Sequence, residues 1–334
     1  MKTTVLLINL GTPDSPITRD VRKYLSEFLN DRRVIDLPWL ARKLLVNLVI
    51  VPFRSPKSAS LYKEIWTSEG SPLLINTLNL RDALRIKFNE SYVVEMAMRY
   101  GNPNLKNVLD NIEKEQPDRI ILLPLYPQYA SSTTLSSIEK ARHIIGTWKQ
   151  VPEIKMIQHF HDHPGFIDSF VQRIQQYNPQ SYDHIIMSYH GLPLNQVREA
   201  HSGNSCESMN CAHKKTKDNN LCYLASCYET SRLLAEKLNM HELDYTVCFQ
   251  SRFSKKWTKP FTDKVVMELA EKGKKRLLVI SPAFVTDCLE TNHELGKELK
   301  ENFEQNGGDQ LTLVESLNSM PHWVDVAAGM IKDI

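Results

Sequence analysis

The chain has 334 residues, of which 42% are hydrophobic and 24% are charged, and this suits a globular protein with two cores. A net charge of +2 without a long Lys or Arg block argues against nucleic acid as a partner. No apolar run is long enough to span a bilayer. The N-terminus leads directly into a strand pattern and lacks the features of a signal peptide, which predicts a cytoplasmic protein.

Short apolar runs alternate with amphipathic helical patterns along the chain. Eight strands are predicted, at Val5–Leu10, Tyr92–Met98, Ile120–Leu125, Ile154–His159, Ile185–Tyr189, Tyr245–Gln250, Leu277–Ser281 and Leu311–Glu315. Helices are predicted between them, at Leu105–Lys114, Ser136–Ile145, Phe166–Gln175, Glu229–Leu238 and Asp263–Gly273. This alternation predicts an α/β fold of mostly parallel sheets with helices on both faces. The eight strands divide into two four-stranded, doubly wound units.

The joint Gln150-Val151-Pro152 separates a predicted helix from a predicted strand, and we place the domain boundary there. The first domain covers residues 1–150 and also includes the closing segment, about residues 310–334. The second domain covers residues 151–309.

The segment Leu37–Phe53 is rich in Leu, Val, Ile, Trp and Phe, and its only charges are Arg42 and Lys43. A buried core helix is the commonest role for such a segment. The lip of an apolar pocket and an interfacial membrane anchor are the alternatives. Cations flank the segment and favour these alternatives, because they could meet acidic ligand groups or anionic lipid; they are Arg32, Arg33, Arg54 and Lys57.

Two motifs follow predicted buried strands, where open α/β sheets bind their ligands. The first is Ser188–Pro193, in which His190 precedes a rigid Gly-Leu-Pro exit. A neutral imidazole there can accept a proton or bind a metal. The second is Asp287–Glu294. If Asp287 caps a helix, Glu290, Glu294 and Glu298 lie on one face of that helix. This row of carboxylates is either a solvated acidic surface or a track that guides a cation.

Polar and aromatic groups follow two other strands. Tyr126 begins a run of aromatic and hydroxyl side chains that ends at Thr134. Such groups suit the binding of a flat ligand, but they are also common in turns. Arg99 and Tyr100 end another strand. Arg99 is suited to bind a ligand carboxylate through two hydrogen bonds, and an intramolecular salt bridge is the alternative.

Four of the six cysteines lie in one polar stretch, with the spacing C-x4-C-x10-C-x4-C; they are Cys206, Cys211, Cys222 and Cys227. In a cytoplasmic chain such clustering indicates metal more often than disulfides. Zinc sites usually contain C-x2-C pairs, so we rank a [2Fe–2S] cluster on four thiolates first, zinc second and free thiols third.

These motifs, in order along nearly the whole chain, resemble the ferrochelatases, which insert Fe²⁺ into a porphyrin at the end of haem synthesis. The matching stretches are Asn9–Pro13, Arg54–Lys57, Gly70–Pro72, Met98–Tyr100, Tyr126–Tyr129, Ser188–Pro193, Phe249–Arg252 and Asp287–Thr291. The resemblance implies two Rossmann-like domains around a central cleft. It also implies that Leu37–Phe53 is an apolar lip that admits substrate and touches a membrane surface, which replaces the core-helix interpretation.

The resemblance assigns roles to particular residues. His190 and Glu290 are the catalytic pair, and Glu294 and Glu298 continue a metal-guiding row from them. Porphyrin contacts are expected at Leu10, Arg54, Arg99, Tyr100, Tyr126, Trp257 and Phe284. An animal-type cluster is excluded, because Ser131 stands where those enzymes have a cysteine. The internal four-cysteine segment instead resembles that of some bacterial members.

The expected function is therefore insertion of Fe²⁺ into protoporphyrin, with release of two protons, to give protohaem. One alternative is a chelatase for another ring and metal, such as coproporphyrin or a cobalt–sirohydrochlorin pair. The other is a non-catalytic porphyrin or haem carrier. The apolar lip favours the less charged protoporphyrin. Sequence reasoning assigns no protein partner and no oligomeric state.

Overall fold

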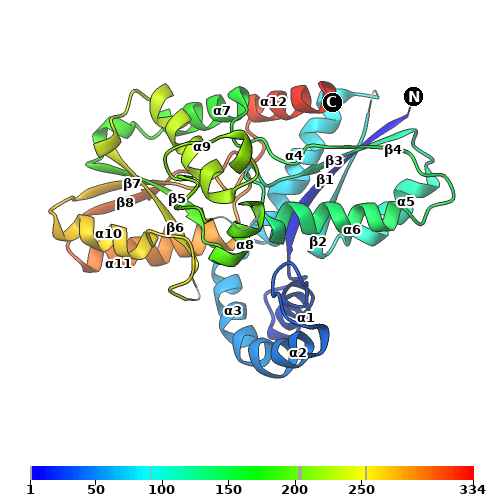
Figure 1. Cartoon of the computed structure of the whole chain (residues 1–334), viewed down its shortest axis with the longest axis horizontal. Helices are drawn as coiled ribbons and strands as arrows, with labels where there is room; N and C mark the ends of the chain where they lie inside the picture. The colour runs from blue at the N-terminus through cyan, green and yellow to red at the C-terminus, as the bar shows by residue number, and fades with distance from the viewer. Residues whose placement is uncertain (1, 91, 202–204, 253) are drawn as a thin grey trace. The chain divides into compact units, whose positions relative to one another are not determined.

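The computed structural model describes residues 2–90, 92–201, 205–252 and 254–334 and contains two four-stranded parallel sheets (Figure 1). The chain divides into two compact units. Unit 1 comprises Met1–Tyr126, Ser131–Gln158 and Asn318–Ile334, and unit 2 comprises Pro127–Ala130 and His159–Leu317. The predicted α/β fold, with eight strands in two sets of four, is confirmed.

The sheet of unit 1 has the strand order β2-β1-β3-β4. Its strands are β1 (Thr3–Thr12), β2 (Val93–Gly101), β3 (Arg119–Pro124) and β4 (Glu153–Met156). The central strands β1 and β3 are continuous apolar runs, as expected for parallel strands that are covered on both faces. Leu6 of β1 pairs with Leu122 of β3, and both are fully buried.

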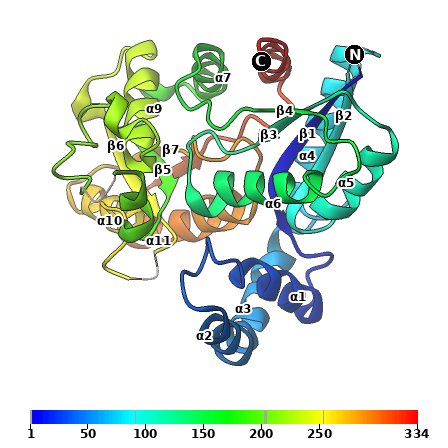
Figure 2. The same cartoon turned by 45° about the vertical axis from the view of Figure 1, so that its right-hand side comes forward.

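Helices cover both faces of this sheet (Figure 2). Leu6 and Ile8 of β1 pack against α5 (Leu105–Lys114) and α6 (Ser136–Ile145). On the opposite face α4 (Pro72–Phe88) contacts β1 and β2, and α12 (Pro321–Lys332) packs on α4. The C-terminal part of the chain thus completes the core of unit 1.

Unit 1 also carries a helical extension beyond the C-terminal end of β1 (Figure 1). It consists of α1 (Thr18–Leu29), α2 (Trp39–Leu44), the π-helical η1 (Leu45–Ile50) and α3 (Val51–Ile65). The core-helix interpretation of residues 37–53 is wrong, because many of the large apolar side chains there are exposed, including Trp39 at 66%, Leu48 at 66% and Phe53 at 81%. Within the described ranges, no helix is long and apolar enough to cross a membrane.

The sheet of unit 2 has the strand order β6-β5-β7-β8. Its strands are β5 (His184–His190), β6 (Tyr245–Gln250), β7 (Arg276–Ile280) and β8 (Gln310–Leu313). Ile186 and Val279 lie in one core with α10 (Thr262–Glu271), the π-helical η7 (Glu290–Glu298) and α11 (Leu299–Gln305). The helices α7 (Pro164–Gln175) and α9 (Tyr223–Lys237) pack together, and α9 contacts β6.

Because β8 pairs with β7, the residues from 310 to 317 belong to unit 2, and the chain returns to unit 1 at Asn318. The expected return at about residue 310 is therefore some residues too early. The domain boundary near residue 150 remains a prediction.

Candidate active site and cysteine cluster

The C-terminal ends of the strands in unit 2 bring several polar side chains together. His190 is the last residue of β5 and pairs with Gln250, the last residue of β6. The chain after β7 leads into η7, which begins at Glu290. Parallel strands end at the same edge of their sheet, so His190 and the start of η7 share this edge.

Local contacts hold His190 in one orientation. Its Nδ1 lies 2.7 Å from the carbonyl oxygen of Gly191. Since a carbonyl only accepts, Nδ1 carries a hydrogen, and Nε2 is the ring nitrogen that accepts a proton when the ring is neutral. Tyr223 Oη donates to the carbonyl oxygen of His190 at 2.8 Å. A Cβ at Gly191 would lie 2.7 Å from the Gln250 carbonyl oxygen and 3.4 Å from the Trp257 ring, so only glycine fits there.

The carboxylates of η7 form a row from the interior to the surface. Glu290 and Glu294 are partly buried and Glu298 is exposed. Glu294 accepts hydrogen bonds from Ser251 Oγ and, at 3.3 Å, from Gln250 Nε2. Burial and the charge of Glu290 raise the pKa of Glu294, whereas the Ser251 hydrogen bond and nearby His190 lower it. His190 and the carboxylate row are therefore electrostatic neighbours.

Asp287 has a different role from the expected helix cap. Its Oδ1 accepts from the backbone N–H of Ser316 at 3.1 Å and from Thr291 Oγ1 at 3.2 Å. Thr291 Oγ1 accepts from the backbone N–H of Cys288 at 2.9 Å. These bonds fix the loop that delivers Glu290, and the widened π-helical turn that follows is a feature common at functional sites.

The residues of unit 1 expected to contact a porphyrin also lie mostly at strand ends. Leu10 is partly exposed near the end of β1, whereas its strand neighbours are buried. Tyr126 follows β3, and burial raises its pKa. Arg54 lies in α3 and is partly buried. In unit 2, Trp257 and Phe284 are partly buried.

Arg99 and Tyr100 are bound to Asp31 within unit 1. The Arg99 guanidinium forms an ion pair with Asp31 and donates to Ser136 Oγ at 2.9 Å. Tyr100 Oη and Ser136 Oγ donate to the same Asp31 oxygen at 2.8 and 2.6 Å. Burial would raise the pKa of Asp31, but these hydrogen bonds and the Arg99 charge lower it. This is the intramolecular salt bridge weighed as the alternative for Arg99, and the expected porphyrin contacts of Arg99 and Tyr100 stay predictions.

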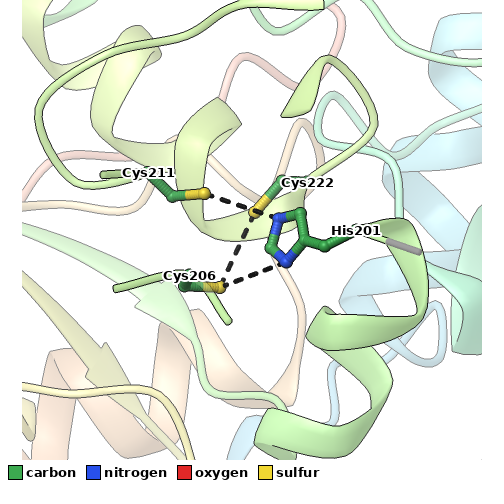
Figure 3. Close-up of side chains that lie close together, drawn as sticks. All are labelled: His201, Cys206, Cys211 and Cys222. Carbon is green, nitrogen blue, oxygen red and sulfur yellow. Dashed lines mark hydrogen bonds between the residues drawn. The ribbon is translucent and has the colours of Figure 1, made fainter. Parts of the chain in front are cut away.

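Three of the four clustered cysteines meet, and a histidine joins them (Figure 3). One ligand atom from each of His201, Cys206, Cys211 and Cys222 lies within 4.8 Å of all the others. Cys227 is fully buried in α9 and is not a member of this group. Sequence reasoning missed His201, although the spacing His-x4-Cys206-x4-Cys211 repeats the interval of the cysteine pair. It also assigned no role to Ser251, which binds Glu294.

Comparison with solved structures finds the same fold in SirB of Bacillus subtilis, a structure with Fe³⁺, at a TM-score of 0.56 and 10% identity over 100% of this chain and 95% of that one. A second structure, the sirohydrochlorin chelatase SirB from the subspecies spizizenii with cobalt, gives the same values. The chain therefore shares the fold of these two structures, the second of which is a sirohydrochlorin chelatase.

The sequence comparisons are more specific. The family model described as Ferrochelatase matches residues 2–333. The ferrochelatase of Coxiella burnetii is 42% identical over 338 residues, which cover 99% of this chain and 93% of that protein. The ferrochelatase of Legionella pneumophila is 40% identical, with coverage of 100% and 99%. The chain belongs to the ferrochelatase family, whose members are enzymes of haem synthesis that insert a metal ion into a porphyrin.

Proposed function

We propose that this protein inserts Fe²⁺ into protoporphyrin IX to give protohaem, with His190 and Glu290 as the catalytic pair. The observation that carries the proposal is the imidazole of His190, held through Nδ1 so that Nε2 is the nitrogen placed to accept a proton, beside a carboxylate row that reaches the surface. Membership of the ferrochelatase family supports the reaction, and the arrangement supports the roles of the residues.

The chemistry requires a base and a path for a cation. A planar porphyrin carries two N–H groups and two nitrogen lone pairs in one plane, so binding energy spent on bending the ring exposes the nitrogens to the metal. Two protons must leave as Fe²⁺ enters. His190 Nε2 accepts a pyrrole proton, and Glu290, Glu294 and Glu298 pass protons outward and guide the hydrated cation inward.

The experiment is anaerobic turnover of protoporphyrin with Fe²⁺, measured as loss of porphyrin fluorescence. Loss of a general base lowers rates by about 10²–10⁴-fold, so we expect a loss of this size in His190→Ala and a loss of insertion in Glu290→Gln. Both variants should still bind porphyrin. Full activity in either variant would refute its assigned role.

Two outcomes would change the proposed reaction itself. Faster turnover of coproporphyrin, or of a sirohydrochlorin-like ring with Co²⁺, would identify another ring as the substrate. Tight binding of each ring without turnover of any would indicate a carrier. The expected porphyrin contacts are tested in the same assay, through increased KM in the alanine variants of Leu10, Arg54, Arg99, Tyr100, Tyr126, Trp257 and Phe284.

We also propose that residues 37–53 touch a membrane surface. Leu40, Leu44 and Val49, at 61, 50 and 51% exposed, join Trp39, Leu48 and Phe53 as exposed apolar side chains of this segment. Exposed apolar helices of this size beside Arg and Lys are typical of interfacial segments. Apolar porphyrins partition into lipid, so such a contact would place the enzyme where its substrate is found.

The cysteine segment, residues 206–227, is a candidate metal site apart from the one at His190. The predicted [2Fe–2S] cluster on four thiolates fits the described residues only in part, because Cys227 lies outside the compact set. We propose for the segment as a whole that it binds a metal, with the iron–sulfur cluster as one candidate.

A further inference from the structure

The spacing of the ligand atoms around His201 matches a single metal ion. Cys206 Sγ lies 3.9 Å from Cys222 Sγ, and Cys211 Sγ lies 3.4 Å from His201 Nε2. With Zn–S bonds of about 2.3 Å, two thiolates on one tetrahedral ion stand roughly 3.8 Å apart. The cluster therefore already has the dimensions of a mononuclear site.

The same spacing does not suit a two-iron cluster. Each iron of a [2Fe–2S] cluster takes two protein ligands, so at least one of three cysteines must bind the second iron. Thiolates on different irons stand farther apart than thiolates that share an ion. In this group every ligand atom is within 4.8 Å of every other, and no member is set apart from the rest.

Hydrogen bonds to sulfur complete the arrangement. Cys222 is the N-cap of α9, and its Sγ accepts from the backbone N–H of Ala225 at 3.4 Å. Cys211 Sγ accepts from Asn219 Nδ2 at 3.5 Å. Donors of this kind stabilise the negative charge of metal-bound thiolates, as does the positive end of a helix dipole.

The segment around the cluster has little else to hold it. Apart from the cysteines, residues 201–222 contain only Met209, Ala212 and Leu221 as apolar side chains. The described part of it forms turns and the short helix η5 (Lys217–Asn219), yet Cys211, Cys222 and His201 are buried. Polar segments of this size usually need a cross-link or a metal to fold.

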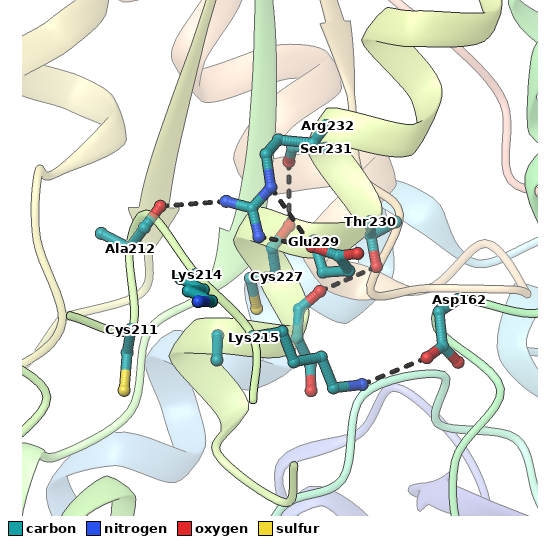
Figure 4. A network of polar contacts seen from close by, with 12 residues as sticks. Asp162, Cys211, Ala212, Lys214, Lys215, Cys227, Glu229, Thr230, Ser231 and Arg232 are labelled. Atoms are coloured by element: carbon teal, nitrogen blue, oxygen red, sulfur yellow. Dashed lines mark hydrogen bonds and ion pairs between the residues drawn. The ribbon is translucent and has the colours of Figure 1, made fainter. Parts of the chain in front are cut away.

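Contacts from outside the cluster hold the segment in place (Figure 4). Arg232 of α9 donates to the carbonyl oxygen of Ala212 at 3.1 Å and forms an ion pair with Glu229. Lys215 pairs with Asp162 at 3.2 Å. These bonds place the loop that carries Cys211 against α9, the helix that begins after Cys222.

We propose that His201, Cys206, Cys211 and Cys222 form a mononuclear Cys₃His site for Zn²⁺, and that His201 takes the place expected for Cys227. Three thiolates and one imidazole in a tetrahedral set are ligands that zinc prefers in closed structural sites. The inference is independent of the proposed activity, because the site would hold the segment and take no part in metal insertion.

Metal analysis of the full chain tests the kind of site. The protein is purified without air and without a metal-binding tag, from cells supplied with both iron and zinc. We expect one zinc per chain and no acid-labile sulfide. Iron and sulfide in equal amounts would overturn the proposal and support the [2Fe–2S] cluster, and a metal-free chain would overturn it as well.

Three variants test the ligand set, with bound zinc as the readout. Loss of an outer partner of a zinc ligand costs about 10–100-fold in affinity, so His201→Ala should lose at least about 100-fold. His201→Cys restores a fourth ligand and should retain zinc. It therefore controls for zinc loss in His201→Ala that results from misfolding at this position. Cys227→Ser, the matched control, should retain it too. Zinc loss in Cys227→Ser with none in His201→Ala would overturn the assignment.

His190→Ala separates this site from the proposed active site, because its zinc content should equal that of the unchanged protein. Co²⁺ exchanged into the site should give the strong visible absorption of a tetrahedral thiolate complex, and this absorption should weaken in His201→Ala but persist in His190→Ala. Removal of zinc with a chelator should open the segment to trypsin at Lys214, Lys215 and Lys217. Unchanged trypsin resistance would contradict a structural role for the ion.

Discussion

Glu294 shows how single contacts tune the proposed site. Its carboxyl group is partly buried beside Glu290, which raises its pKa, and the hydroxyl of Ser251 donates to it, which lowers its pKa. A carboxylate that relays protons must be ionised to accept one. If Glu294 relays protons as proposed, the hydrogen bond from Ser251 extends activity to lower pH without touching the reacting atoms.

We expect Ser251→Ala to shift the pH profile of insertion. Loss of the hydrogen bond to the ionised carboxylate raises the pKa of Glu294, so the acidic limb of kcat/KM should move to higher pH, with less change on the plateau. Ser254→Ala is the matched control, because Ser254 is exposed and its Oγ accepts from the Lys256 backbone. An acidic limb that stays in place, or moves to lower pH, would contradict the role given to Glu294.

At the scale of elements, the helices α2, η1 and α3 depart from the usual burial of apolar residues. The outward-facing apolar side chains of these helices are not covered by the other described residues of unit 1. Such surface is costly in water and is retained where a binding surface needs it.

We expect the double variant Leu48→Ser/Phe53→Ser to bind vesicles of anionic lipid at least about tenfold more weakly, since burial of each large apolar side chain contributes about 1.5–3 kcal/mol. Sedimentation with vesicles measures this. Ile86→Ser/Leu243→Ser is the control, because these side chains are 83 and 89% exposed but lie elsewhere. Equal binding by both double variants would refute the membrane contact of residues 37–53. The fold should remain intact in each, because all four side chains are exposed.

At the scale of the whole molecule, the chain leaves unit 1 and comes back to it. After β8 completes the second sheet, α12 packs on α4 and supplies Trp323, which is fully buried, to unit 1. The last helix is thus part of a core whose other members lie far away in the sequence. Residues from both ends of the chain are needed to complete this unit.

We expect Trp323→Ala to lower the free energy of unfolding by about 3–5 kcal/mol, because a large cavity replaces the buried ring. Asp325→Ala, on the exposed side of the same helix, removes a surface ion pair with Lys87 and should cost under about 1 kcal/mol. Urea denaturation compares the two variants. Similar small losses in both would show that α12 adds little to the core of unit 1.

The sequence alone determined the fold class and the two strand-end motifs. Parallel strands buried on both faces must be continuous apolar runs, so the central strands β1, β3, β5 and β7 were readable from the sequence. Tyr245–Gln250 was predicted with the bounds of β6, and Leu105–Lys114 with those of α5. The position of His190 at a strand end follows from the same pattern, because its strand ends where the apolar run ends.

Only the tertiary structure decided which side chains meet. It placed His201 with three cysteines and left Cys227 apart, and it paired Arg99 with Asp31, which lies 68 positions earlier in the chain. It also exposed the apolar residues of 37–53 and assigned β8 to the second sheet. Periodicity reports how a residue faces within its own element, whereas partners distant in the sequence are set by how the elements pack.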